Sequence, residues 1–301
     1  MPELPDITLY LEALSARIQG QQLLSIEIKN PFFLRSAEPP FALAHDRTVV
    51  SLHRVGKRIV IGLDGDLWLV LHLMIAGRLS WFDSGQAVRG RQILAQFNFA
   101  SGALAVTEAG SKRRASLYVV GSTAALAAHD PGGLEVLGSD LLTFRERLQS
   151  RNHTLKRALT DPHLFSGIGN AYSDEILHAA ALSPIAQTQK LTAAEIDRLQ
   201  QACIAVLTTW TTRLRLDVDG NFPQKVTAFR PGMAVHGRYG QPCPVCATAV
   251  QRIRYADNEV NYCPRCQTGG RLLADRALSR LLRRDWPRSI EELERIQSSR
   301  A

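Results

Sequence analysis

Apolar residues near the start of the chain recur at spacings of four, three and four residues. This spacing places them on one face of an amphipathic helix, which we predict over residues 4–19. Gly20 directly follows this stretch and ends the helix. The apolar positions are Ile7, Leu11, Leu14 and Ile18.

The pattern changes between about residue 23 and residue 120. Short β-rich runs such as "TVVSLHRV", "LWLVLHL" and "ALAVTEA" follow one another, separated by Gly, Asp or Ser. At least six runs occur without a helical segment between them. This arrangement predicts an antiparallel β-sandwich.

A third pattern begins after a weakly patterned connection at residues 121–135. From about 140 to 215 the apolar spacing is helical, and a loop and a cysteine cluster follow. We therefore expect an α+β protein in four parts. They are a β-sandwich domain at 1–125, a helical domain at 136–235, a cysteine module at 236–270 and a basic helical extension at 271–301.

Charge narrows the choice of partner. The chain of 301 residues has a formal net charge of +8, which favours an anionic partner, with nucleic acid the leading candidate. The chain has no stretch of 18 or more consecutive apolar residues, so we predict no membrane span. The N-terminus has no signal-peptide pattern. We expect a cytoplasmic protein.

Four of the five cysteines lie close together, in "CPVC" and "CPRC". Two thiolates two residues apart reach the same tetrahedral ion, and a second pair completes a closed site. Cys243, Cys246, Cys263 and Cys266 are therefore predicted to bind one structural zinc ion, in preference to forming disulfides or a redox centre. The residues between the pairs have the pattern of a β-hairpin, and Cys203 is expected to be a buried side chain.

A glycine-containing turn occurs in "FSGIGNAYSDEIL". Asn170 falls where the second of two helices would begin, and the N–H groups of a helix start can bind an anion. An ordinary helical hairpin would have the same sequence pattern. Lys57, after a glycine at a strand start, is either a solvated edge charge or a phosphate contact.

These stretches form a recognisable set with the N-terminus. "MPELPD", "VGKRIVIGL", "LHLMIAGRL", "GIGNAYSDEIL", "KVTAFR" and "HGRYGQPCPVC…YCPRCQ" occur in this order over residues 1–267. Together they resemble the formamidopyrimidine-DNA glycosylase/endonuclease VIII family of DNA repair enzymes. The resemblance implies a β-sandwich with a leading helix, a helix–two-turns–helix domain and a zinc finger, as well as a monomer that acts on duplex DNA.

The resemblance also implies roles in catalysis. Pro2 would be the nucleophile once Met1 is removed, because its ring nitrogen would become a free amine with a pKa of roughly 8. Glu3 would donate a proton to the sugar, although an acid here also suits a helix start. Lys57 would contact the phosphate beside the lesion. Excision of the oxidised base would be followed by strand cleavage through β,δ-elimination.

Further residues are implied as DNA contacts. Asn170 would bind phosphate, with Tyr172 nearby, and Lys156 and His72 are weaker candidates for the DNA backbone. A flipped base leaves a gap that a wedge residue fills. Met74 or Ile75 is the candidate wedge, and sandwich core is the alternative for both.

The chain departs from the family pattern at several positions. The loop that probes the orphaned base has Lys112, Arg113 and Arg114 but no aromatic residue. Asn258 stands where family fingers usually have an arginine that contacts phosphate, and Arg252, Arg254 or Arg265 are possible substitutes. Asp6 stands where family members often have glutamate.

Two hypotheses follow. The leading one is a bifunctional DNA glycosylase with abasic-site lyase activity, for which oxidised purines are favoured as substrates and oxidised pyrimidines are the alternative. The alternative is a non-catalytic, zinc-dependent protein that binds damaged DNA. After the finger, residues 271–285 have an amphipathic helical pattern, which we expect to dock on the protein itself rather than on DNA.

Overall fold

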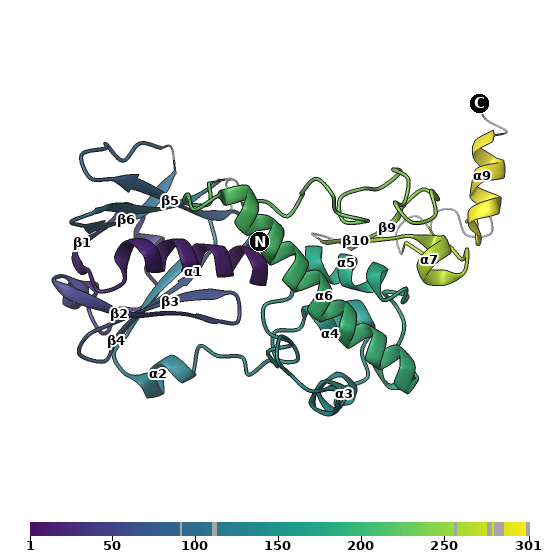
Figure 1. Cartoon of the computed structure of the whole chain (residues 1–301), viewed down its shortest axis with the longest axis horizontal. Coiled ribbons are helices and arrows are strands. Elements are labelled where there is room, and N and C mark those ends of the chain that lie inside the picture. Colours follow the sequence, from purple (N-terminus) through teal and green to yellow (C-terminus); the bar gives the residue numbers. More distant parts are fainter. Residues whose placement is uncertain are drawn as a thin grey trace. The chain divides into compact units, whose positions relative to one another are not determined.

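The computed structural model describes residues 1–90, 92–109, 113–224, 226–255, 258–275, 279 and 286–298. They form two compact units (Figure 1). The first contains Met1–Gly132 and Thr208–Ala228, and the second contains Gly133–Leu207 and Phe229–Ala301. The cysteine module belongs to the second unit, and residues 208–228, expected in the helical domain, belong to the first.

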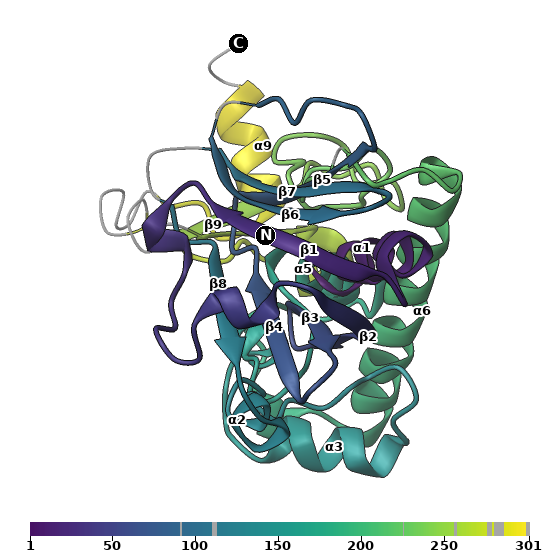
Figure 2. The same ribbon diagram turned by 90° about the vertical axis from the view of Figure 1, so that its left-hand side faces the viewer.

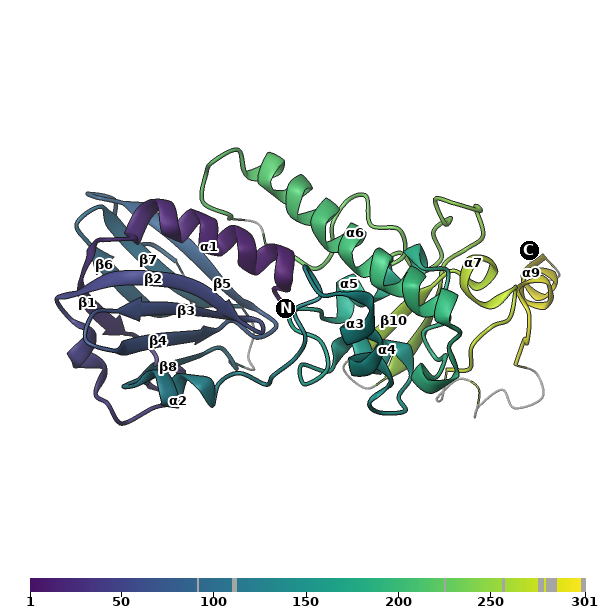
Figure 3. The same ribbon diagram turned by 60° about the horizontal axis from the view of Figure 1, so that its bottom comes forward.

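Helix α1 spans Leu4–Ile18, with Glu3 as its N-cap and a proline in its first turn. The predicted apolar face is correct, because Ile7, Leu14 and Ile18 have no exposed surface. Figure 3 shows α1 lying along the strands of the first unit.

Eight strands of the first unit form one antiparallel sheet in the order β5-β7-β6-β1-β2-β3-β4-β8. Only two residue pairs join β1 to β2, so the sheet folds into two four-stranded halves (Figure 2). The predicted sandwich is confirmed. The strands are β1 Gln22–Ile28, β2 Arg47–Val55, β3 Arg58–Leu63, β4 Leu67–His72, β5 Gly77–Asp83, β6 Ile93–Phe99, β7 Gly102–Glu108 and β8 Ser116–Val120.

The main core lies between the two halves and includes one face of α1. Strand alternation divides β3, because Ile59 and Ile61 enter this core whereas Val60 joins a smaller cluster with Val70 and Val120. The remaining elements of the first unit are short. They are η1 Pro31–Phe33, η2 Phe41–Ala44 and α2 Thr123–Ala127.

The second unit contains the helices predicted from the 3.6-residue pattern. These are α3 Leu141–Gln149, α4 Leu155–Thr160, α5 Asn170–Ala179 and η3 Thr188–Lys190, followed by α6 Ala193–Val218, which continues into the first unit. The predicted hairpin is also confirmed, as β9 Gln251–Tyr255 pairs with β10 Asn258–Tyr262 before α7 Pro264–Thr268. Helix α9 spans Ile290–Ser298. The predicted helix at 271–285 is wrong at its start, because residues 271–275 form no helix, and residues 276–278 and 280–285 lie outside the described residues.

Candidate active site and nucleic-acid interface

The start of α1 holds the candidate nucleophile and its acid in a buried position. Pro2 is buried, and Glu3 has 2% of its surface exposed. The backbone N–H of Glu3 donates a hydrogen bond to Oδ2 of Asp6 at 2.9 Å. This contact fixes the residue that follows Pro2, because the helix cap and the first turn are tied together.

The N-terminal amine lies in an environment that favours its neutral form. Burial lowers the pKa of the Met1 amine, and the positive charges of Arg78 and Lys57 lower it further, whereas Glu3 and Asp6 oppose the shift. An amine must be neutral to act as a nucleophile. Burial at this end of α1 therefore favours the neutral form of the Met1 amine, and the carboxylate of Glu3 lies close enough for its charge to act on that amine.

Lys57 and His72 belong to the same electrostatic group. Burial lowers the pKa of Lys57, Glu3 raises it and Arg58 lowers it. Burial also lowers the pKa of His72 to about 4, with Arg58 and Lys57 adding to the shift. His72 is therefore neutral near pH 7, and Lys57 lies close enough to Glu3 for their charges to interact.

The turn between β4 and β5 presents one of the two candidate wedge residues. Met74 is half-buried with a left-handed φ of 50°, whereas Ile75 is 59% exposed. Gly77 is required here, because a Cβ atom would lie 2.2 Å from the carbonyl oxygen of Leu73. The exposure of Ile75 rules out a sandwich-core role for that residue.

Arg78 connects this turn to the loop after α6. Its Nη1 donates to the carbonyl oxygens of Ile75 at 3.1 Å and Gly77 at 2.7 Å, and its Nε donates to that of Val226. Arg78 was not among the predicted site residues. An arginine directly after the glycine of "AGRL" was the available signal.

Glu108 binds the backbone at the end of the loop that is predicted to probe the orphaned base. Its carboxylate is buried with 1% exposure, and Oε2 accepts hydrogen bonds from the N–H groups of Arg114 at 2.9 Å and Ala115 at 3.0 Å. Arg113 and Arg114 are exposed, whereas Lys112 lies outside the described residues. The loop therefore presents two arginines from a fixed base.

In the second unit, Asn170 begins α5 after Gly169, as predicted. Its Nδ2 donates to the carbonyl oxygen of Glu259 in β10 at 3.0 Å. The candidate phosphate-binding turn is thereby attached to the zinc-finger hairpin.

A buried carboxylate lies directly behind this turn. Asp174 accepts hydrogen bonds from Lys156 Nζ at 2.5 Å and from the N–H of Asn261 at 3.1 Å, and its Oδ2 lies 2.8 Å from His236 Nδ1. Lys156 also donates to the carbonyl oxygen of Asn170 at 2.6 Å. The ammonium group of Lys156 therefore supports the turn from inside the unit.

The carboxylate of Glu175, the next residue in the chain, binds the backbone of residues 234–236. Glu175 accepts hydrogen bonds from the N–H groups of Ala234, Val235 and His236 at 2.7 to 2.9 Å. Tyr172 is buried with 1% exposure. Asp174, Glu175 and His236 were not among the predicted site residues, although two adjacent acids after a glycine turn in a basic chain were a visible signal.

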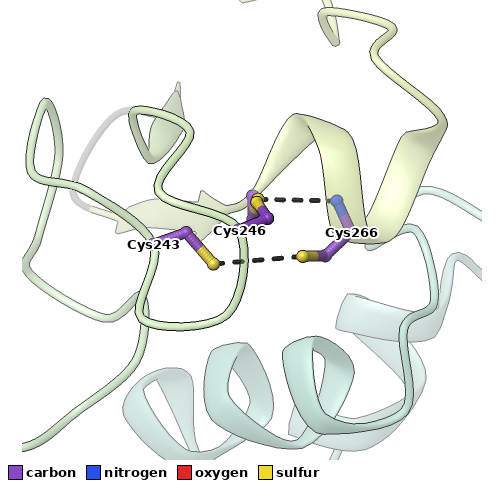
Figure 4. Close-up of side chains that lie close together, drawn as sticks. Cys243, Cys246 and Cys266 are labelled. Carbon is purple, nitrogen blue, oxygen red and sulfur yellow. Dashed lines mark hydrogen bonds between the residues drawn. The ribbon is translucent and has the colours of Figure 1, made fainter.

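The four predicted zinc ligands lie together. Their Sγ atoms are all within 4.8 Å of one another, with Cys243 to Cys266 at 3.9 Å and Cys246 to Cys263 at 3.4 Å. Zn–S bonds of about 2.3 Å in a tetrahedron separate sulfur atoms by about 3.8 Å, so the geometry fits zinc. Figure 4 shows the sulfur atoms of Cys243 and Cys266 facing each other.

The protein therefore has one structural zinc site. His178 of α5 supports it, since its Nε2 lies 3.3 Å from the Sγ of Cys243. Burial lowers the pKa of His178.

The finger arginines considered as substitutes for Asn258 have partners. Arg252 lies 3.2 Å and Arg254 3.7 Å from Oε2 of Glu259, and the guanidinium of Arg252 lies over the Tyr239 ring at 4.1 Å. The backbone of Asn258 pairs with Tyr255, and its side chain lies outside the described part of the chain. Arg265 lies in α7.

Family models match three successive parts of the chain. The formamidopyrimidine-DNA glycosylase N-terminal domain matches residues 1–115, the H2TH domain of the same enzyme matches 134–213, and the zinc finger found in FPG and IleRS matches 240–269. No helix in the described segments is long and apolar enough to cross a membrane.

Sequence comparison with individual proteins also finds formamidopyrimidine-DNA glycosylases. Formamidopyrimidine-DNA glycosylase from Moorella thermoacetica is 31% identical over 267 residues, which are 84% of this chain and 95% of that protein. A formamidopyrimidine-DNA glycosylase-like protein of Mycobacterium tuberculosis is 42% identical over 153 residues, which are 51% of this chain and 93% of that protein.

Solved structures agree with these matches. The Lactococcus lactis FPG in complex with Fapy-dG-containing DNA has a TM-score of 0.78 at 25% identity, covering 88% of this chain and 100% of that one. The same enzyme with DNA containing an abasic site has a TM-score of 0.77 at 25% identity, covering 88% and 99%. The chain belongs to the formamidopyrimidine-DNA glycosylase family of DNA repair proteins, which bind DNA and contain a zinc finger.

Proposed function

We propose that the protein is a bifunctional DNA glycosylase and abasic-site lyase that uses Pro2, freed by removal of Met1, as its nucleophile. The observation that carries the proposal is the buried pair of Pro2 and Glu3. The lowered pKa of the Met1 amine, one residue before Pro2, supports it, because the same surroundings would favour a neutral amine at Pro2. A protein that only bound DNA would have no need for a buried acid beside such an amine.

The reaction begins with attack of the Pro2 nitrogen on C1′ of the flipped nucleotide. The bond from C1′ to the base breaks, and the base leaves with the electron pair and takes up a proton. The C1′–O4′ bond then opens while Glu3 protonates O4′. The amine loses its proton, and C1′ and nitrogen form an iminium.

The iminium makes strand cleavage possible because it acidifies the proton on C2′. Loss of this proton breaks the C3′–O3′ bond and releases the 3′ phosphate. Loss of the C4′ proton then breaks the C5′–O5′ bond and releases the 5′ phosphate. One covalent intermediate thus serves both excision and cleavage.

The remaining site residues have binding roles in this proposal. Lys57 and Asn170 contact phosphate, and Lys156 positions Asn170 through its carbonyl oxygen. Ile75 is the wedge that enters the stack when a base flips out. Asn258 hydrogen-bonds to phosphate without adding a charge, and the exposed Arg113 and Arg114 contact the opposite strand.

We propose oxidised purines, including formamidopyrimidines, as the main substrates, with oxidised pyrimidines as the second class. Solved complexes of the Lactococcus lactis enzyme contain Fapy-dG, an abasic site and an oxidised pyrimidine, which supports both classes. The protein would act as a monomer in the cytoplasm.

Reductive trapping tests the proposal. Borohydride added to the protein with a duplex containing an abasic site should give a covalent adduct. Glu3→Gln should slow formation of the adduct from DNA with an intact oxidised base, whereas Glu12→Gln on the exposed side of α1 should not. Binding without any adduct would favour a non-catalytic protein that recognises damage.

A further inference from the structure

Arg58 occupies a position that the proposed roles do not use. It begins β3, where it pairs with Val55 of β2 and His72 of β4. Since Ile59 and Ile61 enter the main core, Arg58 and Val60 face the opposite side of the sheet. Cross-strand partners share a face, so the side chains of Arg58 and His72 lie on the same outer side.

The side chain of Arg58 is half-buried. Its Nε is buried without a hydrogen-bond partner, and Arg58 forms no ion pair with any carboxylate among the described residues. A buried donor atom without an acceptor destabilises a fold, because its lost hydrogen bonds to water are not replaced. The Nε group of Arg58 therefore adds no hydrogen bond to the DNA-free fold.

One lysine and two histidines lie near Arg58. Its charge lowers the pKa values of Lys57, His72 and His129, so all three lie within its electrostatic reach. This region of positive potential borders the lysine assigned to a DNA phosphate. An anion bound here would balance the charge of the half-buried guanidinium and could accept hydrogen bonds from its Nη groups.

We propose that Arg58 binds a DNA backbone phosphate next to the one contacted by Lys57. The planar guanidinium can donate two parallel hydrogen bonds to one phosphate group, which Lys57 cannot do as a point charge. The inference rests on the family's DNA binding and not on the Schiff-base chemistry.

Salt dependence measures the contact directly. The dissociation constant of a duplex containing a tetrahydrofuran abasic-site analogue is followed over a series of potassium chloride concentrations. Loss of one phosphate contact reduces the slope of log Kd against log salt by about 0.9. Arg58→Met should show this reduction, and Arg58→Lys should keep most of the slope.

Arg47→Met is the matched control. Arg47 begins β2 at the opposite end of the same hairpin, is exposed and lies near Asp64. Its replacement should leave the salt slope unchanged. A single neutral methylphosphonate at the contacted phosphate should weaken binding by the wild type but not by Arg58→Met.

Stability separates this role from a structural one. Arg58→Met should have an equal or higher free energy of unfolding in urea, because it removes an unpartnered charge. An unchanged salt slope would overturn the proposal, and so would failure of Arg58→Met to fold, which would show that the guanidinium is needed without DNA. Arg58→Met at saturating concentration should still give the borohydride adduct. Loss of the salt-slope effect would therefore overturn the Arg58 contact alone, and loss of the adduct in the wild type would overturn the proposed catalysis alone.

Discussion

The backbone N–H of Glu3 donates to Asp6 Oδ2 at 2.9 Å. The acid at position 6 is therefore part of the start of α1, immediately beside the candidate nucleophile. The family resemblance left its role open because aspartate replaces the usual glutamate. Here the shorter carboxylate reaches the N-cap, so we assign it a positioning role.

Replacing Asp6 tests that role. Asp6→Ala removes an acceptor at the helix N-terminus and should lower the free energy of unfolding by about 1 kcal/mol. It should also slow borohydride trapping, because Pro2 and Glu3 lose their fixed position. Asp6→Asn retains an acceptor and should lose much less in both measurements. Equal effects of the two substitutions would show that the negative charge, not the hydrogen bond, is what matters.

His72 should make stability depend on pH. Its pKa is lowered from about 6.5 when unfolded to about 4 in the folded protein. The unfolded chain thus binds the proton more tightly, and stability is full above pH 6.5 and falls as the pH drops towards 4. The loss over this range is roughly 3 kcal/mol.

Urea unfolding at several pH values checks this prediction. His72→Phe removes the titrating group, so its stability should fall less than that of the wild type between pH 6.5 and pH 4, and the carboxylates account for the remainder. Parallel curves for the two proteins would contradict the burial of His72 in its neutral form.

Asp174 should be among the most sensitive positions in the second unit. Asp174→Asn removes the negative charge between Lys156 and His236 and should lower the free energy of unfolding by about 3–5 kcal/mol. DNA affinity should fall with it, because Lys156 and Asn261 lose their shared partner. Asp217→Asn is a control on an exposed site of α6. A small change at Asp174, similar to that at Asp217, would contradict the proposed support of the turn.

Zinc removal should abolish DNA binding. The hairpin that contacts Asn170 folds around the ion, so a chelator should release zinc and raise Kd, and added zinc should restore it. Cys246→Ser should lower the bound zinc, whereas Cys203→Ala should retain one ion per chain because Cys203 is buried in α6. Unchanged affinity after verified metal loss would contradict the link between finger and turn.

Periodicity and spacing predicted most of the architecture. The α1 face, the short strands and the cysteine pairs depend on residues close in sequence, and the structure confirms them. The family resemblance supplied the candidate roles of Pro2, Glu3 and Lys57, which local patterns could not.

Contacts between distant segments were not predictable. Arg78 reaches Val226 and Asn170 reaches Glu259, and neither pairing leaves a local pattern. The sequence also could not predict which of Met74 and Ile75 is exposed. The two residues are adjacent and apolar, and only the geometry of the turn makes Ile75 exposed and Met74 half-buried. The burial of Lys156 against Asp174 likewise follows from tertiary packing, which turns a candidate surface cation into an internal support.

The central claim is that the N-terminal proline becomes covalently attached to DNA. The most direct test is mass spectrometry of the borohydride-reduced adduct after proteolysis. We expect the DNA remnant on the peptide that begins with Pro2, and no adduct for protein that retains residues before Pro2. Attachment to a lysine such as Lys57, or an equal adduct from the blocked N-terminus, would contradict the account.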